Sequence, residues 1–290
     1  MRFALSTHLF HDERLSRAHL AAIAAAGFTD VEVFATRSHV DYHDRGRVHE
    51  VRGWLAGLGL SAVSVHGPIC ESYADGRWGR AYSIASTDRA RRDEGVAEVR
   101  AAIEAARVLG AVSIVVHLGL PHGQPIPPGD NDAGAARRSL DTLVAIAHDA
   151  GVRVAVELVP NALSTADELA ALFEGDLDLG ETGTCVDLGH AHLAGAIDEA
   201  IDRLGGTILT THVHDNHGRE DTHLVPYQGT IDWPSSLASL WKVGYRGPLV
   251  FEVADRGDAM AVLGRVVDAR ARLQVILDDL DGFDFGDQGG

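Results

Sequence analysis

Residues that can bind a metal ion stand at the ends of six consecutive short apolar runs. These runs finish in His66, His117, Glu157, Asp187, His212 and Glu252. Buried carboxylates that face one another repel unless a cation lies between them, and most arginines of this chain fall in stretches expected to be helices or loops. The pattern therefore predicts a divalent metal site that combines three carboxylates with imidazole.

The donor set indicates which ion this site would prefer. Carboxylate oxygens predominate, which favours Mn²⁺, Mg²⁺ or Co²⁺ over a closed structural zinc site, with Zn²⁺ as a further candidate. Four protein ligands would leave two positions of an octahedron open. Two adjacent oxygens of a polyol or hydroxy-ketone could fill them, so we expect one ion per chain that also holds the substrate.

Eight strand–helix units are expected to position these residues. Between the apolar runs lie amphipathic stretches with apolar residues three and four positions apart, and several of these stretches end in glycine. This alternation predicts an α/β fold, a single (β/α)₈ TIM barrel over residues 1–277, in which all strand ends share one mouth. An open doubly wound sheet is the alternative, but no GxGxxG motif follows the first strand. The expected strands are Phe3–Ser6, Asp30–Phe34, Ala62–His66, Ser113–His117, Arg153–Glu157, Thr184–Asp187, Ile208–His212 and Leu249–Glu252.

Three further segments lie outside this regular alternation. The connections 67–87 and 118–132 are long and would overhang the barrel mouth, where loops of that length are usually functional. Residues 278–290 are acidic and glycine-rich, so we expect them to form a flexible tail.

Composition excludes several other classes of protein. The formal net charge is −17 and Lys242 is the only lysine among 25 basic residues, which disfavours nucleic acid as a partner and argues against Schiff-base chemistry. Cys70 and Cys185 form no CxxC motif, so a cysteine metal site or a disulfide framework is not expected. No signal peptide or membrane span is recognisable, and we expect a cytoplasmic protein, with homo-oligomerisation left open.

Several motifs resemble those of the xylose-isomerase-like TIM-barrel superfamily of sugar phosphate isomerases and epimerases, to which endonuclease IV is related. The resemblance spans roughly Phe3 to Leu273, and it rests on the order and spacing of short motifs. These are Val65-His66-Gly67-Pro68, Val156-Glu157, Val186-Asp187-Leu188-Gly189-His190-Ala191-His192, Thr211-His212-Val213-His214-Asp215-Asn216 and Phe251-Glu252.

The resemblance implies a metal-dependent isomerase or epimerase of a sugar or related polyol-ketone, working through an enediolate. It implies that the metal ligands are Glu157, Asp187, His212 and Glu252. It also implies that Glu157 and Glu252 transfer the proton as acid and base. The residues expected to bind the substrate are His66, His117, His190, Arg219, Asp221 and His223.

Two other activities remain open for the same residues. Some relatives are lyases that dehydrate cyclic hydroxy-ketones through the same kind of enolate. Endonuclease IV instead holds three zinc ions, and the histidines and Asp221 expected to bind substrate here could complete such a centre for phosphodiester cleavage of abasic DNA. The stretch from Asp215 to Trp233 looks more like the isomerase branch, although Tyr227-Gln228-Gly229 departs from the usual Gly-Glu-Gly of both groups.

Other residues are candidates for supporting roles. Glu32 lies within the second expected strand and could contact substrate or form a structural ion pair. His8 follows the first strand and could line the mouth or lie in a solvated loop. His214 follows the expected ligand His212 by two residues and could orient a ligand. Trp78 could form an apolar wall for a sugar or simply pack.

Overall fold

Eight parallel strands close into a barrel in the computed structural model, which describes residues 1–122, 126–175, 182–255 and 257–282. The strands follow one another around the barrel in chain order, and the last pairs with the first. Each predicted strand falls on one of them, which confirms the (β/α)₈ fold. Their bounds are β1 (Arg2–Ser6), β2 (Asp30–Phe34), β3 (Ser61–His66), β6 (Ser113–Val116), β7 (Arg153–Glu157), β8 (Thr182–Asp187), β9 (Ile208–Val213) and β10 (Pro248–Phe251).

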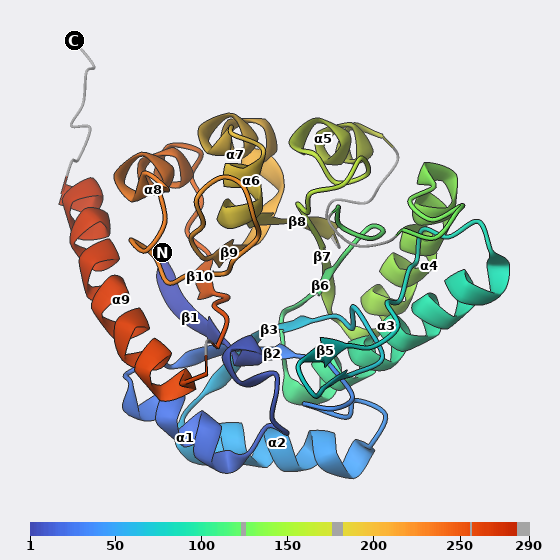
Figure 1. Cartoon of the computed structure of the whole chain (residues 1–290), viewed down its shortest axis with the longest axis horizontal. Coiled ribbons are helices and arrows are strands. Elements are labelled where there is room, and N and C mark those ends of the chain that lie inside the picture. The colour runs from blue at the N-terminus through green and yellow to red at the C-terminus, as the bar shows by residue number, and fades with distance from the viewer. Residues whose placement is uncertain (123–125, 176–181, 256, 283–290) are drawn as a thin grey trace.

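Helices surround the barrel (Figure 1). Most begin at an Asp, Ser or Thr whose side chain accepts a hydrogen bond from a backbone N–H of the first turn. Gly59, Gly110 and Gly151 end their helices in the left-handed conformation, as their positions predicted. The helices are α1 (Arg17–Ala25), α2 (Arg45–Leu58), α3 (Arg89–Leu109), α4 (Ala133–Ala150), α5 (Ala166–Glu174), α6 (Leu188–Leu193), α7 (Ile197–Leu204), α8 (Trp233–Lys242) and α9 (Ala259–Gly282), with short 3₁₀ turns at Thr7–Phe10 and Gly205–Thr207.

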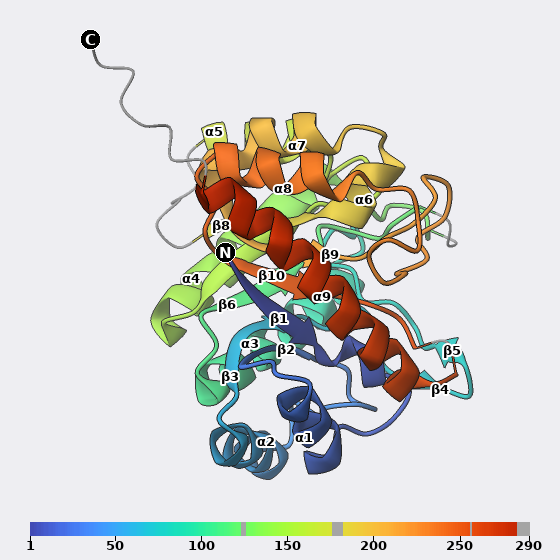
Figure 2. The same ribbon diagram turned by 90° about the vertical axis from the view of Figure 1, so that its left-hand side faces the viewer.

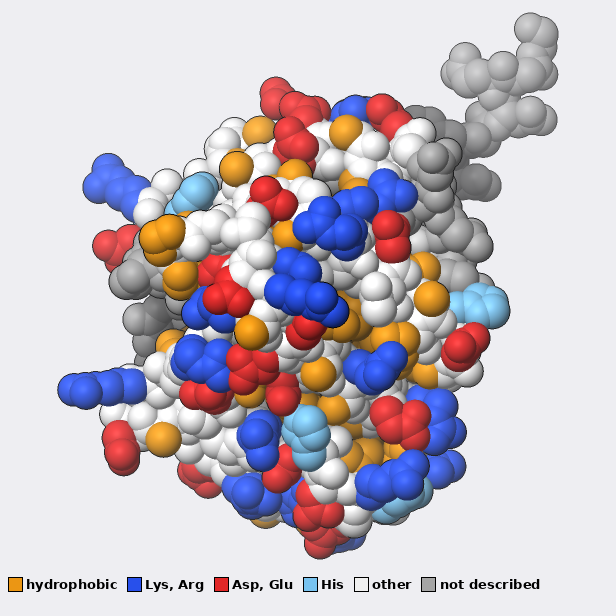
Figure 3. Space-filling view, turned by 90° about the vertical axis from the view of Figure 1, so that its right-hand side faces the viewer, with side chains coloured by type: hydrophobic (Ala, Val, Ile, Leu, Met, Phe, Trp, Pro, Cys, Tyr) orange, Lys and Arg blue, Asp and Glu red, His pale blue; other side chains and the backbone are white. Residues whose placement is uncertain are grey.

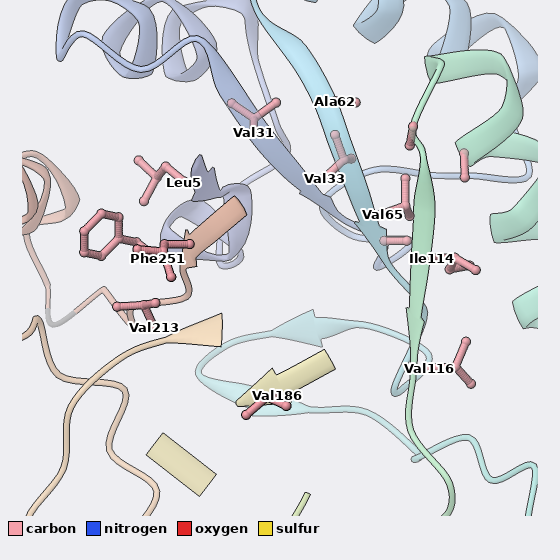
Figure 4. Close-up of a cluster of buried hydrophobic side chains, with 14 of the residues drawn as sticks. Leu5, Val31, Val33, Ala62, Val65, Ile114, Val116, Val186, Val213 and Phe251 are labelled. Carbon is pink, nitrogen blue, oxygen red and sulfur yellow. The ribbon is translucent and has the colours of Figure 1, made fainter. Parts of the chain in front are cut away.

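The main core lies between the strands and the helices, where side chains such as Leu5, Ile114 and Phe251 are buried (Figure 4). Small clusters fill the barrel interior instead, including one of Val115, Ala155 and Cys185. Because successive strand residues point to opposite faces, the residues two positions further along the strands share this inward direction. The acidic groups that end β7 and β8 therefore stand directly above a plug of small apolar side chains.

The loop 67–87 folds over the barrel mouth. It contains a short hairpin of β4 (Tyr73–Ala74) and β5 (Arg77–Trp78), which lies on the side of the molecule towards which β1 runs (Figure 2). The prediction that this connection overhangs the mouth is thus matched by its position. Among the described residues, none of the helices is long and apolar enough to cross a membrane.

The chain end differs from the expectation of a flexible tail that starts at residue 278. Helix α9 continues to Gly282, because Leu277 is buried and Leu280 packs against the main core. The acidic residues of this segment occupy the remaining faces of the helix. The rest of the predicted tail, 283–290, lies outside the described residues.

Candidate active site

Four side chains converge where β7, β8, β9 and β10 end. Glu157, Asp187, His212 and Glu252 each offer one donor atom, and these four atoms all lie within 4.8 Å of one another. His212 Nδ1 stands 3.3 Å from both Glu157 Oε1 and Glu252 Oε2, and 3.6 Å from Asp187 Oδ2. Opposite ligands of an ion such as Mg²⁺ are about 4.2 Å apart, so the four atoms fit one divalent cation with little movement.

The Asp187 carboxylate is held from two sides. It caps helix α6, where the backbone N–H of His190 donates to Oδ1 over 2.7 Å. The same oxygen lies 3.0 Å from His214 Nε2. A Cβ on Gly189 would lie 2.0 Å from the His214 ring, so this arrangement requires glycine there. His214 thus orients the acid, as its position in the sequence suggested.

The residues expected to bind substrate form a ring around this cluster, with one exception. His66 Nε2 and His117 Nε2 lie 3.3 and 2.8 Å from Glu157 Oε2. Asp221 Oδ2 lies 3.1 Å from His190 Nε2 and 3.2 Å from His223 Nε2. The exception is Arg219, which is exposed on the loop after β9 and is not among the residues that line the cavity described below.

Backbone carbonyls fix the orientation of three of these histidines. The Nδ1 atoms of His66, His190 and His223 lie 2.9, 3.0 and 2.8 Å from the carbonyl oxygens of Gly67, Leu158 and Glu252, respectively. A carbonyl oxygen only accepts, so each Nδ1 carries the proton. The Nε2 atoms face the carboxylates of Glu157 and Asp221 and donate to them while the histidines are protonated; loss of that proton would free Nε2 for a cation.

The charges of the cluster are strongly coupled. Burial alone lowers the pKa of His66, but its hydrogen bond to Glu157 and the charge of Glu252 outweigh that effect and raise the pKa to about 9. Burial raises the pKa of Glu157, yet the charges of His117 and His212 hold it well below its usual value. Protonated histidines thus balance the carboxylates, and a divalent cation would take over that role.

A cavity of about 610 Å³ opens onto the cluster and has two different walls. We call the first the polar wall; it comprises His66, His117, Glu157, His190, Asp221, His223 and Glu252. We call the second the aromatic wall; it comprises His8, His11, Phe34, Tyr73 and Trp78. Its rings stack on one another, with centroids 4.5 Å apart for His8 and His11 and 5.0 Å apart for His11 and Trp78.

Sequence reasoning missed His11 of the aromatic wall, and it placed Tyr73 only as part of the loop 67–87 expected to overhang the mouth. His11 follows the 3₁₀ turn after β1, and Tyr73 begins the hairpin in the long loop. Their rings lie 4.5 Å apart between centroids. Both belong to segments that follow the carboxyl end of a strand, and this position is the only signal in the sequence that could have pointed to them.

Comparison with known proteins places this arrangement in a family. The sequence model of the xylose isomerase-like TIM barrel family matches residues 20–276. The chain belongs to that family. The chain spans about half the length of the curated relatives it matches. One of these, an uncharacterised protein of Methanocaldococcus jannaschii designated MJ1311, is 32% identical over 172 residues, which are 56% of this chain and 57% of that protein.

Solved structures of other proteins share this fold over nearly the whole chain. A D-tagatose 3-epimerase-like protein superimposes with a TM-score of 0.78 at 24% identity and covers 97% of this chain and 99% of its own. The D-psicose 3-epimerase of Clostridium cellulolyticum H10, solved with D-tagatose, has a TM-score of 0.76 at 18% identity and covers 96% of this chain and 99% of its own. At these identities the likeness establishes the barrel.

Proposed function

We propose that the protein is a divalent-metal-dependent isomerase or epimerase of an uncharged sugar or related polyol-ketone. The observation that carries the proposal is that Glu157 and Glu252 both converge on His212 and both line the cavity. Two carboxylates beside one carbon acid can supply the base that removes a proton and the acid that returns it. The names of the two structural neighbours, both 3-epimerases or similar to one, support the same reaction class.

The cation would be held by Glu157, Asp187, His212 and Glu252, and it would supply Lewis acidity at a carbonyl and its neighbouring hydroxyl. The oxygen-rich donor set favours Mn²⁺, Mg²⁺ or Co²⁺, with Zn²⁺ as a further candidate. One glutamate removes the proton from the carbon beside the carbonyl. The same glutamate or the other returns a proton, and the face to which it is returned decides whether the configuration is inverted.

The cavity also suggests what the substrate looks like. Among the described residues that line it, none is lysine or arginine, and Lys242, on α8, pairs with Asp202 at 71% side-chain exposure. A phosphate group would find only imidazoles as cationic partners there. The Nε2 atoms of His66, His190 and His223 suit hydroxyl groups, and the aromatic wall suits the apolar face of a sugar ring.

A second candidate function is a phosphodiesterase with three zinc ions. It is favoured by two further groups whose donor atoms lie within 4.8 Å of one another: His66, His117 and Glu157, and His190, His214, Asp221 and His223. The charge argues against it. The formal net charge is −17. On the side of the barrel that carries α3 and α4, shown in Figure 3, basic and acidic side chains are interspersed without a continuous basic stripe, and arginines such as Arg89, Arg107 and Arg137 pair with acids on their own helices.

One experiment separates the candidate activities. The metal-supplemented protein is incubated in D₂O with a panel of ketoses, aldoses and cyclic polyol-ketones, and proton NMR follows the carbon beside the carbonyl. An isomerase or epimerase incorporates deuterium only when metal is present, without loss of mass balance. A lyase instead releases water and forms a conjugated product that absorbs in the ultraviolet.

The contrary outcome is equally clear. Cleavage of abasic DNA, three zinc ions per chain by elemental analysis and no exchange with any sugar would overturn the proposed isomerase and favour the phosphodiesterase. Absence of any bound metal after supplementation would overturn both.

A further inference from the structure

We propose that Glu32 is a positioning residue that orients His212 towards the metal. This inference rests on the proposed function, because it assumes that His212 is a metal ligand. The Glu32 carboxylate would accept a hydrogen bond from Nε2 of His212 and so leave the Nδ1 lone pair directed at the cation. Glu32 itself would touch neither the cation nor the substrate.

The geometry around His212 assigns different roles to its two ring nitrogens. Nε2 lies 3.3 Å from Glu32 Oε2, whereas Nδ1 faces the oxygens of Glu157 and Glu252 at 3.3 Å. A carboxylate beneath the ring fixes the proton on Nε2, and a metal ligand must present an unprotonated nitrogen. His212 thereby differs from His66 and His190, in which Nδ1 contacts a backbone carbonyl oxygen and Nε2 faces a carboxylate of the polar wall.

The location of Glu32 excludes the contact with substrate that its sequence position left open. Its side chain is fully buried inside the barrel and is not among the residues that line the cavity. The pairing of β2 with β3 shifts register between Val31 and Glu32, which sets Glu32 opposite Ser64. Ser64 Oγ then donates to Oε2 over 2.7 Å, so one oxygen receives both the hydroxyl and the imidazole.

A buried carboxylate is costly for the fold, which argues that this one serves a purpose. A charge in the interior must be compensated by partners, and Oε1 of Glu32 has no hydrogen-bond partner among the described residues. Apolar residues in place of the acid and its polar partners together would fill the barrel interior without any buried charge. Partners that orient metal-bound histidines typically contribute 10- to 100-fold to metal affinity, and that contribution explains an acid here.

The test measures metal affinity rather than turnover. Metal-free wild type, Glu32→Gln and Glu32→Leu are titrated with Co²⁺ in competition with a chromophoric chelator, and the visible absorption of bound Co²⁺ is recorded. Urea unfolding of each metal-free variant is measured in parallel. Glu98→Gln is the matched control, because Glu98 accepts hydrogen bonds from Tyr42 and His43 on the helical surface, away from the metal cluster.

We expect Glu32→Leu to weaken Co²⁺ binding 10- to 100-fold. Glu32→Gln should weaken Co²⁺ binding less, because the amide oxygen can still accept a hydrogen bond from Nε2–H of His212. Both should shift the Co²⁺ absorption, and the loss of Co²⁺ affinity should exceed what any loss of metal-free stability accounts for. Glu98→Gln should leave affinity and spectrum unchanged.

Two results would overturn the inference alone: wild-type affinity and spectrum in both Glu32 variants, or a loss of affinity that only parallels a loss of metal-free stability. If the wild type itself bound no Co²⁺, the proposed metal centre would fail, and this inference with it.

Discussion

The two walls of the cavity both carry buried histidines, yet the pKa values of these histidines are shifted in opposite directions. On the aromatic wall, burial lowers the pKa of His8 well below its ordinary value, and the neighbouring His223 and His11 lower it further. On the polar wall, burial also lowers the pKa of His223, but the charge of Asp221 and its hydrogen bond outweigh burial and raise the pKa to about 9. The same side chain is thus a neutral ring on one wall and a cation on the other.

This difference suggests separate roles for the two walls: the polar wall suits the chemical step, and the aromatic wall suits contact with the substrate. Most residues of the polar wall lie at or next to strand ends, where the barrel holds them rigidly and carboxylates surround them. The aromatic wall comes largely from the turn after β1 and the hairpin of β4 and β5. Its rings contact mainly one another, although His8 also lies beside His223, with ring centroids 5.4 Å apart. We therefore expect changes in the polar wall to affect turnover and changes in the aromatic wall to affect substrate affinity.

The largest effect is expected at Glu252. Glu252→Gln keeps an oxygen that can coordinate a metal but loses the group that accepts a proton, so turnover should fall by about 10²- to 10⁴-fold. Metal content and substrate affinity should change only a few-fold. Deuterium exchange rates and elemental analysis measure the two quantities. An active Glu252→Gln variant would show that Glu252 does not perform the proton transfer.

A second effect concerns the stability of the metal-free protein. His66 and His223 have pKa values near 9 in the folded state, against about 6.5 when unfolded. Below pH 6.5 both states hold the proton and the stabilisation is fully present. As pH rises through 9 the folded state also loses its proton and the stabilisation disappears, at up to roughly 3 kcal/mol for each histidine.

Urea unfolding at pH 6.5 and pH 9.5 measures this loss of stability. With saturating Mg²⁺ the two stabilities should differ much less, because the cation then balances the carboxylates. His66→Asn should reduce the pH dependence. His8→Asn should not, because a histidine with a lowered pKa changes stability only below pH 6.5. An equal effect of both substitutions would contradict the difference between the walls.

The smallest effect is expected at Trp78, whose side chain lines the cavity but is 44% exposed. Trp78→Ala removes part of the aromatic wall and should weaken substrate affinity about fivefold, which corresponds to about 1 kcal/mol of lost apolar contact. Turnover at saturation should stay unchanged. Trp54→Ala is the control, since Trp54 packs against Arg47 on α2, outside the cavity. A fall in kcat without a change in KM would assign Trp78 to the chemistry.

Much of the polar wall and of the cluster of Glu157, Asp187, His212 and Glu252 could be predicted from local patterns. The end of a parallel strand defines which side chain reaches the mouth, so Glu157, Asp187 and His212 could be identified from the apolar runs that precede them. Arg219 could not be placed in this way, because it lies six residues after the end of β9. The alternation of inward and outward side chains along a strand no longer applies there. His11 was overlooked for the same reason, and Tyr73 was placed only within its loop, since the paths of these loops depend on what they pack against.

The sequence by itself determined the barrel, its eight strands and the acids and histidines at the strand ends, because strand alternation and glycine-terminated helices are local and repeat along the chain. Only the tertiary structure decided which nitrogen of His212 faces the acids, that Glu32 lies beneath it, and that α9 extends to Gly282. Those features depend on register between strands and on packing of distant segments. Such contacts join residues as far apart as Glu32 and His212, and no local pattern in the chain records them.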